Sequence, residues 1–538
     1  MKKKNHKIRV EKRNRRLEQQ FWAKVNQEKE KWQNGAMLMI EENAVKMILN
    51  GVIIAATGSG KTRLQCKLIL RFIRQTKGFG IIVVKSPRIQ LTQQLTKEVQ
   101  KYLIGKKNDG ELYQQDLIQF YTTPVMFHSG DDLDLIDKNE LKGLVEGSKE
   151  YNEKKKELLR YAQEVKASTS KDELKNYIVN AQKSNKVLVI QTTYHSFHKI
   201  CEVTQEMGIE IGLGLNDEAQ YLAQKEFHKV FKTCNSKSEY SFTATPTSGN
   251  ERAIFLDNNE KNLNPIYGEF CFKLTAGNAI LNGIICWAKW VEFDLNHNEQ
   301  EGLKLSHKTI LSSFDRMKED LGRKAKMLAT ESGVRALKAL NKPNSALMKR
   351  VQEDPNFHFL TIASSRNSIC HNGVIITRSE FMENLAQLSE DPNIDLVVVH
   401  YDILSEGIDV PSMDGVVFLR SVSISKFYQI LGRCLRRDFG KECGYIICPK
   451  YTGDSSMYTQ YHKWRENMFD LKYLPMDEIQ ERSGSSSKLS EDPDPDFKLS
   501  GVALDYRVKI EKPKTTQELL NRLKLQGFNI KNHLQHGA

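Results

Sequence analysis

The residues that decide the fold are GVIIAATGSGKT at positions 51–62. Up to Ala55 they form an apolar run with the length of a buried strand, and a helix is expected to begin near Lys61. Between these elements, Gly58 and Gly60 allow backbone N–H groups to approach a bound group closely, and the helix N-terminus adds a positive field. A strand, a glycine loop and a helix in this order are typical of an anion-binding turn in a parallel α/β sheet.

The chemistry of this loop suits a nucleoside triphosphate with Mg²⁺. Lys61 can reach the β- and γ-phosphates, and the hydroxyl of Thr62 can ligate Mg²⁺. The strict pattern begins with Gly, whereas this chain has Ala55 there. The alternative is a glycine-rich turn without a ligand, which the flanking strand and helix disfavour. The expected nucleotide-binding residues are Ala55, Thr57, Gly58, Ser59, Gly60, Lys61 and Thr62.

Apolar runs alternate with helical segments on both sides of the loop. This pattern predicts doubly wound parallel sheets of the α/β class. The expected strands include residues 81–86, 124–129, 187–193, 209–215 and 240–246, then 357–365, 395–400, 415–420 and 444–449.

Changes in composition predict five parts. The basic N-terminal extension is 1–35, and the first α/β block is 36–250 with a charged helical insertion at 131–185. A connecting and helical segment, 251–355, precedes the second block at 356–455. The remainder, 456–538, contains a Ser-, Asp- and Pro-rich linker at 483–498.

The charge distribution favours a polyanionic partner. The chain of 538 residues has a net charge of +13, and its first sixteen residues hold nine Lys or Arg and one Glu. The alternative is a solvated basic tail. No apolar run approaches the length of a membrane span, so no membrane partner is expected. Nine scattered cysteines without a CxxC pair indicate a reduced, cytoplasmic chain without a structural metal.

An acidic pair follows one of the expected strands. Asp217 and Glu218 would lie at the carboxyl end of a parallel strand, where such sheets bind ligands. One carboxylate there can hold Mg²⁺, and its neighbour can orient or deprotonate an attacking water.

The series of motifs resembles that of the superfamily 2 helicases and translocases over roughly residues 37–450. The phosphate loop resembles motif I, and Asp217–Gln220 is similar to the DEAD/DEAH box. The remaining matches are Pro87–Leu91 with Gln94, His128–Gly130, Thr192–Phe197, Thr243–Pro246, Ser405–Pro411, and Gln429, Gly432, Arg433 and Arg436.

The resemblance implies two RecA-like lobes with helical insertions, which bind ATP and Mg²⁺ in the cleft between them. The catalytic residues it implies are Lys61, Asp217, Glu218, Gln220, Arg433 and Arg436, with Arg433 and Arg436 as arginine fingers. Thr62 and Asp217 would hold the metal, while Gly407, Asp409 and Gln429 would contact the nucleotide. Arg88, Gln94, Ser129, Gly130, Thr192, Thr193 and Tyr194 would contact nucleic acid.

The expected function is an ATP-dependent DNA helicase or translocase. Residues 407–412, GIDVPS, and 429–436, QILGRCLR, are similar to the DNA-directed group, which includes restriction-enzyme translocase subunits and phage-type repair helicases. DNA is therefore favoured over RNA, and a phage or viral source is a further hypothesis.

Three alternatives remain open. They are an RNA helicase, a restriction or defence motor that needs a nuclease or specificity subunit, and a nucleic-acid-binding scaffold with a degenerate ATPase. The scaffold alternative rests on Gly212, Gly214 and Asn216, which interrupt the strand before the acidic pair. The glutamine that reads adenine in the family has no clear match near Glu41 or Glu42.

Overall fold

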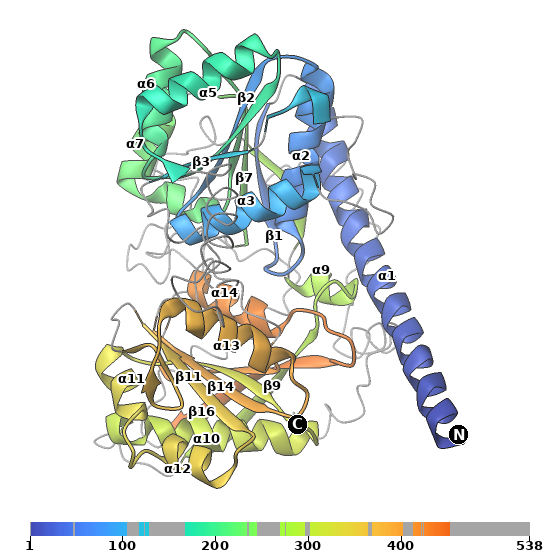
Figure 1. Ribbon diagram of the computed structural model, residues 1–538, viewed down its shortest axis with the longest axis vertical. Coiled ribbons are helices and arrows are strands. Elements are labelled where there is room, and N and C mark those ends of the chain that lie inside the picture. The colour runs from blue at the N-terminus through green and yellow to red at the C-terminus, as the bar shows by residue number, and fades with distance from the viewer. Residues whose placement is uncertain are drawn as a thin grey trace, which may run out of the picture.

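The computed structural model describes residues 2–46, 49–104, 118–122, 124–128, 167–233, 236–244, 269–274, 276–295, 302–363, 368–401, 413–420, 422 and 424–451. These residues form two α/β lobes, each built around an eight-stranded sheet (Figure 1). The predicted fold class, two RecA-like lobes with doubly wound parallel sheets, is confirmed.

The first sheet has the order β4-β3-β5-β2-β6-β7-β1-β8, and its paired strands are parallel. Because the strands are parallel, their carboxyl ends meet at one edge, which carries the loops discussed below. The strands are β1 (Asn50–Ala55), β2 (Gly80–Ser86), β3 (Val125–Phe127), β4 (Ala167–Ser168), β5 (Val187–Thr193), β6 (Ile211–Asn216), β7 (Ser236–Thr243) and β8 (Glu269–Leu274).

Helices cover both faces of this sheet. On one face, Leu64 of α2 and Leu95 of α3 join the large core cluster that contains Val52 and Val84. On the other face, α5 and α6 pack on a separate cluster that contains Val83. The helices of this lobe are α2 (Lys61–Thr76), α3 (Ile89–Ile104), α5 (Lys171–Lys183), α6 (Phe197–Glu206) and α7 (Lys225–Thr233).

The second sheet has the order β13-β12-β11-β14-β10-β15-β16-β9. Its pairs are parallel except at the β11-β12-β13 edge, which is antiparallel. Its strands are β9 (Trp287–Leu295), β10 (Lys326–Thr330), β11 (Phe357–Ile362), β12 (Cys370–His371), β13 (Val374–Ile375), β14 (Asp395–His400), β15 (Gly415–Phe418) and β16 (Cys443–Tyr451).

Helices also pack on both faces of the second sheet. On one face they enclose a cluster around Phe314 and Met327. On the other face, Phe381 and Phe427 belong to the same large cluster as the first lobe, so apolar packing is continuous between the lobes. The helices are α10 (Gly302–Leu321), α11 (Val334–Leu340), α12 (Ala346–Glu353), α13 (Arg378–Glu390) and α14 (Ile424–Cys434).

The structure corrects two of the expected boundaries within the lobes. The insertion expected at 131–185 does not extend that far, because Leu174 and Ile178 of α5 are buried in the first lobe. The segment expected to connect the blocks, 251–355, instead supplies β8 to the first sheet and both β9 and β10 to the second, with α9 (Ala276–Leu281) between β8 and β9. The strands in this segment are short and lie among basic helices, so the sequence pattern does not show that they belong to two different sheets. Residues 456–538 lie outside the described part of the chain.

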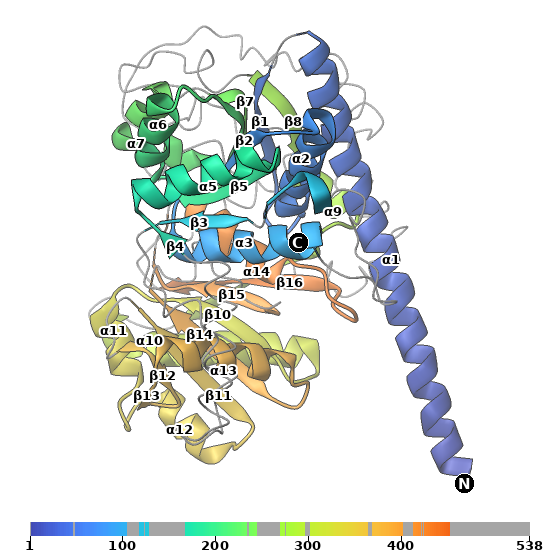
Figure 2. The ribbon, with the colours of Figure 1, turned by 45° about the horizontal axis from the view of Figure 1, so that its top comes forward.

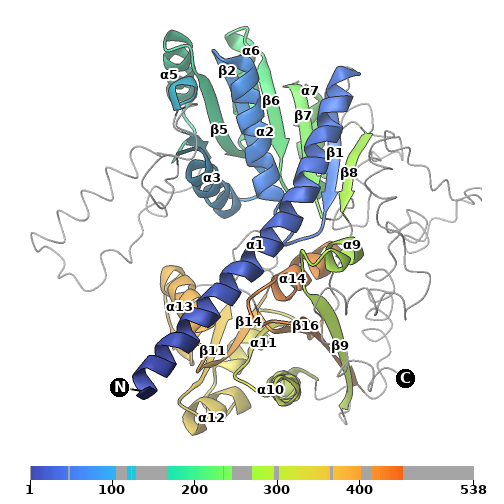
Figure 3. The ribbon, with the colours of Figure 1, turned by 90° about the vertical axis from the view of Figure 1, so that its right-hand side faces the viewer.

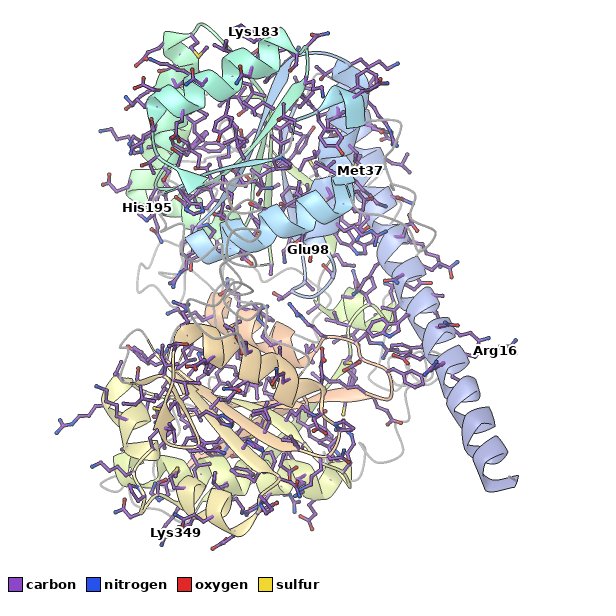
Figure 4. The ribbon with its side chains drawn as sticks, viewed as in Figure 1. Arg16, Met37, Glu98, Lys183, His195 and Lys349 are labelled. Carbon is purple, nitrogen blue, oxygen red and sulfur yellow. The ribbon has the colours of Figure 1, made fainter. Side chains whose placement is uncertain are left out.

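The third correction concerns the N-terminus. No boundary falls at residue 35, because α1 (Lys2–Val45) is one continuous helix. Its last turns, with Trp32 and Met39 fully buried, belong to the core of the first lobe. From there α1 crosses beside both lobes toward its N-terminus (Figure 3). Figure 4 labels Met37 on the packed part of the helix and Arg16 on the part that leaves the first lobe.

Two expectations from composition can be compared with the structure. No helix in the described residues combines the length and apolar character needed to cross a membrane. Seven described cysteines are buried free thiols.

Candidate nucleotide site between the lobes

The phosphate loop lies between β1 and α2, as its sequence predicts. Gly58 and Gly60 have φ values of +82° and +97°, which glycine adopts without strain. Lys61 begins α2, and its Nζ donates to the carbonyl oxygen of Ala55 at 3.0 Å. Burial lowers the pKa of Lys61, while the carboxylates of Glu218 and Asp217 oppose that shift. A cation is therefore held beside two acidic groups.

Two polar side chains in the loop are placed to bind a ligand. Among the described residues, the buried hydroxyls of Thr57 and Ser59 have no hydrogen-bond partner. Burying a hydroxyl without a partner is costly, so such groups are expected to bind something that the protein itself does not supply. Hydroxyls and backbone N–H groups of this loop suit the oxygens of a triphosphate.

The acidic pair lies at the carboxyl end of β6, beside the phosphate loop. Gln65 of α2 donates to Asp217 Oδ1 at 2.8 Å, which joins the two segments. Burial, and next the charge of Glu218, raise the pKa of Asp217 to about 7. Glu218 has a φ of +49°, a left-handed conformation that is unfavourable for this residue type. Such strain is frequent where a side chain must be aimed at a ligand.

Glu218 is held from both lobes. Gln220 Nε2 donates to Glu218 Oε2 at 2.8 Å, and Thr243 Oγ1 donates to Gln220 Oε1 at 2.7 Å. From the second lobe, Gln429 Nε2 donates to the same Glu218 oxygen at 3.2 Å. These bonds connect the ends of β6 and β7 with α14.

Helix α14 packs directly on the phosphate loop, and Figure 2 shows it between the lobes. A Cβ built on Gly432 would lie 2.3 Å from Thr57 Cγ2, and one built on Gly58 would lie 3.4 Å from Arg436 Cγ. Arg433 is buried, and its charge contributes to the lowered pKa of Lys61. The structure therefore brings both predicted arginine fingers to the cleft.

Sequence reasoning missed two residues of α1 that hold the phosphate loop. Trp32 Nε1 donates to the carbonyl oxygen of Ser59 at 3.0 Å, and Gln33 Nε2 donates to that of Gly60 at 3.2 Å. Both side chains are buried. The sequence places a glutamine of this kind near residues 41 and 42, whereas Gln33 lies further from the loop along the chain. The signal available in the sequence was the aromatic–glutamine pair at the start of the amphipathic part of α1.

The predicted nucleic-acid contacts are placed very differently from one another. The side chain of Arg88 is exposed, as a contact residue must be. Thr192, Thr193 and Tyr194 are buried instead, and the Tyr194 hydroxyl donates to the carbonyl oxygen of Asp217 at 2.6 Å. A contact of these three residues with nucleic acid stays a prediction. The side chain of Gln94, and Ser129, Gly130, Gly407 and Asp409 as whole residues, lie outside the described part.

The donor set fits Mg²⁺. Thr62 lies in the first turn of α2 and Asp217 lies beside that helix, so each can offer a hard oxygen ligand. The described residues contain no cluster of three or more His, Cys, Asp or Glu side chains that could hold a metal.

The protein-family model described as "Type III restriction enzyme, res subunit" matches residues 26–248. The matched residues run from α1 through the phosphate loop and the acidic pair to the end of β7. Comparison with curated proteins gives no match.

Solved structures show the same fold over most of the chain. The ATP-dependent Type ISP restriction-modification enzyme LlaBIII bound to DNA matches with a TM-score of 0.54 and 19% identity, over 83% of this chain and 30% of that one. A nuclease-deletion mutant of the Type ISP enzyme LlaGI with a DNA substrate mimic matches with a TM-score of 0.52 and 19% identity, over 83% and 29%. A fragment of a putative HsdR subunit from Vibrio vulnificus has a TM-score of 0.47 and 15% identity, over 82% and 66%.

This chain thus spans less than a third of the length of the two Type ISP enzymes. Residues 26–248 are similar to the res-subunit family model, and the two-lobed fold is the one found in the two Type ISP enzymes.

Proposed function

We propose that this protein is a nucleic-acid-dependent ATPase, an ATP-dependent DNA translocase or helicase that hydrolyses ATP in the cleft between its lobes. The observation that carries the proposal is the double hold on Glu218, from Gln220 of its own lobe and Gln429 of the other. A carboxylate held this way is sensitive to how the lobes meet, which is what a motor requires of its hydrolytic centre.

The chain's own residues divide the work in this proposal. The phosphate loop binds the β- and γ-phosphates, and Lys61 leaves the Ala55 carbonyl to neutralise them. Glu218 orients the attacking water and accepts its proton, while Arg433 and Arg436 stabilise the charge that develops on the γ-phosphate. Thr62 and Asp217 would hold Mg²⁺, which neutralises phosphate charge when it is bound.

DNA is the favoured substrate because two matched proteins are described as bound to DNA or to a DNA mimic. An RNA substrate remains the first alternative. A restriction or defence motor is the second, and it is supported by the matched family and by the part-length coverage of the Type ISP enzymes. It implies a separate nuclease or specificity subunit as partner.

The scaffold alternative loses its only support. The glycines that interrupt the strand before Asp217 make room for buried side chains, because a Cβ on Gly214 would lie 2.0 Å from Glu239 Oε2. The interruption therefore has a packing reason and does not indicate a degenerate site.

The test is ATP turnover measured without nucleic acid and with single-stranded DNA, duplex DNA or RNA. Lys61→Ala and Glu218→Gln should each abolish stimulated turnover. The first removes the positive charge that neutralises the phosphates, and the second removes the base that accepts the proton of the attacking water. Lys349→Ala and Glu353→Gln, the same substitutions at exposed positions on α12, should turn over like the wild type. Robust turnover by either site variant would refute the proposal, and the best activator would identify the substrate.

A further inference from the structure

A buried polar cluster lies at the ends of three central strands of the first lobe. We call Lys85, Asn216, Glu239 and Ser241 the strand-end cluster. Lys85 Nζ donates to Glu239 Oε1 at 2.5 Å, and the two side chains are 0% and 5% exposed. Asn216 Nδ2 donates to the same Glu239 oxygen at 2.7 Å and to Ser241 Oγ at 3.0 Å. The strand register explains these bonds, because Lys85 is opposite Asn216, and Asn216 is opposite Ser241.

Stability alone does not account for this cluster. The ammonium group of Lys85 lies over the Phe197 ring, 4.3 Å from its centroid, and burial lowers the pKa of Lys85. Replacing a buried ion pair by apolar side chains of similar size is often neutral or stabilising, so such pairs are better explained by the arrangement they specify. Position 214 also has no side chain, and a Cβ there would occupy the space that the Glu239 carboxylate fills.

The cluster adjoins the backbone of the acidic pair. The carbonyl oxygen of Lys85 accepts from the Asp217 N–H at 2.8 Å, so one residue joins the ion pair to the motif that follows β6. The next carbonyl, of Ser86, accepts from the Tyr194 N–H at 2.8 Å, and the Tyr194 hydroxyl returns to the carbonyl of Asp217 at 2.6 Å.

The same three strands lead to three parts of the proposed machinery. β2 continues to the exposed Arg88, and β6 continues to Asp217 and Glu218. β7, which carries Glu239, ends at Thr243, which bonds Gln220. A displacement of β2 by nucleic acid would therefore reach the acidic pair through residues bonded to Glu239.

We propose that Glu239 is a positioning residue that couples nucleic-acid binding at the end of β2 to ATP hydrolysis at Glu218, by fixing β2, β6 and β7 relative to one another. The inference rests on the proposed function. In this proposal Glu239 contacts neither the nucleotide nor the nucleic acid. Variants of Glu239 should therefore lose the stimulation of ATP turnover by nucleic acid and still bind both ligands.

The experiment compares Glu239→Gln, the double variant Lys85→Met with Glu239→Leu, and the control Asp320→Asn in the full chain. Asp320 forms the corresponding half-buried ion pair with Lys289 in the second lobe, away from the cleft. For each protein we would measure the Tm, the Kd for the activating nucleic acid and for a fluorescent ATP analogue, and ATP turnover with and without that nucleic acid.

Both Glu239 variants should lose about tenfold in the ratio of stimulated to basal turnover, with both Kd values within about twofold. The double variant replaces the buried ion pair by apolar side chains, which can pack against each other. If it has the wild-type Tm and still loses stimulation, the loss is not caused by lower stability. Wild-type stimulation in the double variant, or an equal loss in Asp320→Asn, would overturn the inference. Absence of stimulation in the wild type would instead refute the proposed function itself.

Discussion

At the scale of single residues, the phosphate loop is supported from outside by an aromatic residue. Trp32 stacks on Phe272 at a centroid distance of 5.9 Å and donates to the Ser59 carbonyl. One side chain therefore contributes to the core through its ring and to the phosphate loop through its N–H. The two contributions can be separated by substitution.

We predict that Trp32→Phe keeps an aromatic ring against Phe272 and costs about 2 kcal/mol of unfolding free energy, from the lost hydrogen bond and the smaller ring. It should nevertheless weaken ATP binding, because the loop loses the donor that orients Ser59. Trp32→Ala, by contrast, should cost about 3–5 kcal/mol. Urea unfolding and a fluorescent ATP analogue measure the two effects. Unchanged ATP affinity in the stable Phe variant would contradict the role of the N–H.

The raised pKa of Asp217 gives a second prediction, on pH dependence. With a folded-state pKa of about 7 and an ordinary value of 3.8, the folded protein retains a proton that the unfolded chain releases between these pH values. This contribution to stability is therefore present at low pH and is lost as the pH rises through about 7. Asp217→Asn should flatten that part of the profile.

The measurement is the free energy of unfolding by urea at pH 5, 6, 7 and 8, without nucleotide or Mg²⁺, for the wild type and Asp217→Asn. The difference between the two proteins isolates this one group from all the others that titrate. A difference that does not change across this range would show that Asp217 is ionised throughout.

At the scale of elements, β6 shows where the sequence is informative and where it is not. Its period-two pattern and the acidic pair after it correctly predict the strand and its end. The glycines within it carry no such signal, because what they accommodate comes from elsewhere in the chain. A Cβ on Gly212 would lie 2.4 Å from Phe72 Cζ, a contact that exists only once α2 packs on the sheet.

We therefore predict that Gly212→Ala destabilises the protein by about 1–3 kcal/mol through overpacking. Phe72→Leu removes the far end of the ring and should recover part of that loss when it is combined with Gly212→Ala. Urea unfolding of the two single variants and the double variant gives the interaction energy between the positions. Strict additivity would mean that the ring is not what excludes the methyl group.

The course of α1 likewise depends on contacts that its own sequence does not show. Its charged first half predicts a separate extension, and its amphipathic second half predicts a helix of the first lobe, so the sequence suggests a boundary. The structure has one helix, because no Gly or Pro with a helix-ending conformation separates the halves. Phe21 in α1 then contacts the second lobe, with its ring 5.8 Å from Phe439 and 5.2 Å from the Arg437 guanidinium. Contacts of this kind follow from how the lobes meet and cannot be predicted from local patterns.

At the scale of the whole molecule, the order of motifs predicts two lobes and a cleft, but the contacts across the cleft are specific to the folded chain. Gln429 reaches Glu218 across a sequence separation of 211 residues. α14 approaches the phosphate loop closely because position 432 has no side chain. The second lobe is therefore docked on the phosphate loop, and the glycine sets how closely α14 can approach it.

We predict that Gly432→Ala separates the lobes without unfolding either of them. The added methyl group would lie 2.3 Å from Thr57 Cβ and Cγ2, so α14 must move away from the loop and withdraw Gln429 and Arg433. ATP turnover should fall at least about tenfold, as expected when charge-stabilising groups are displaced, while ATP still binds to the first lobe. Gly333→Ala is the matched control, since a Cβ there meets nothing within 4 Å. Small-angle scattering would show an increased radius of gyration in Gly432→Ala alone, and wild-type turnover in that variant would mean that hydrolysis does not require this docking.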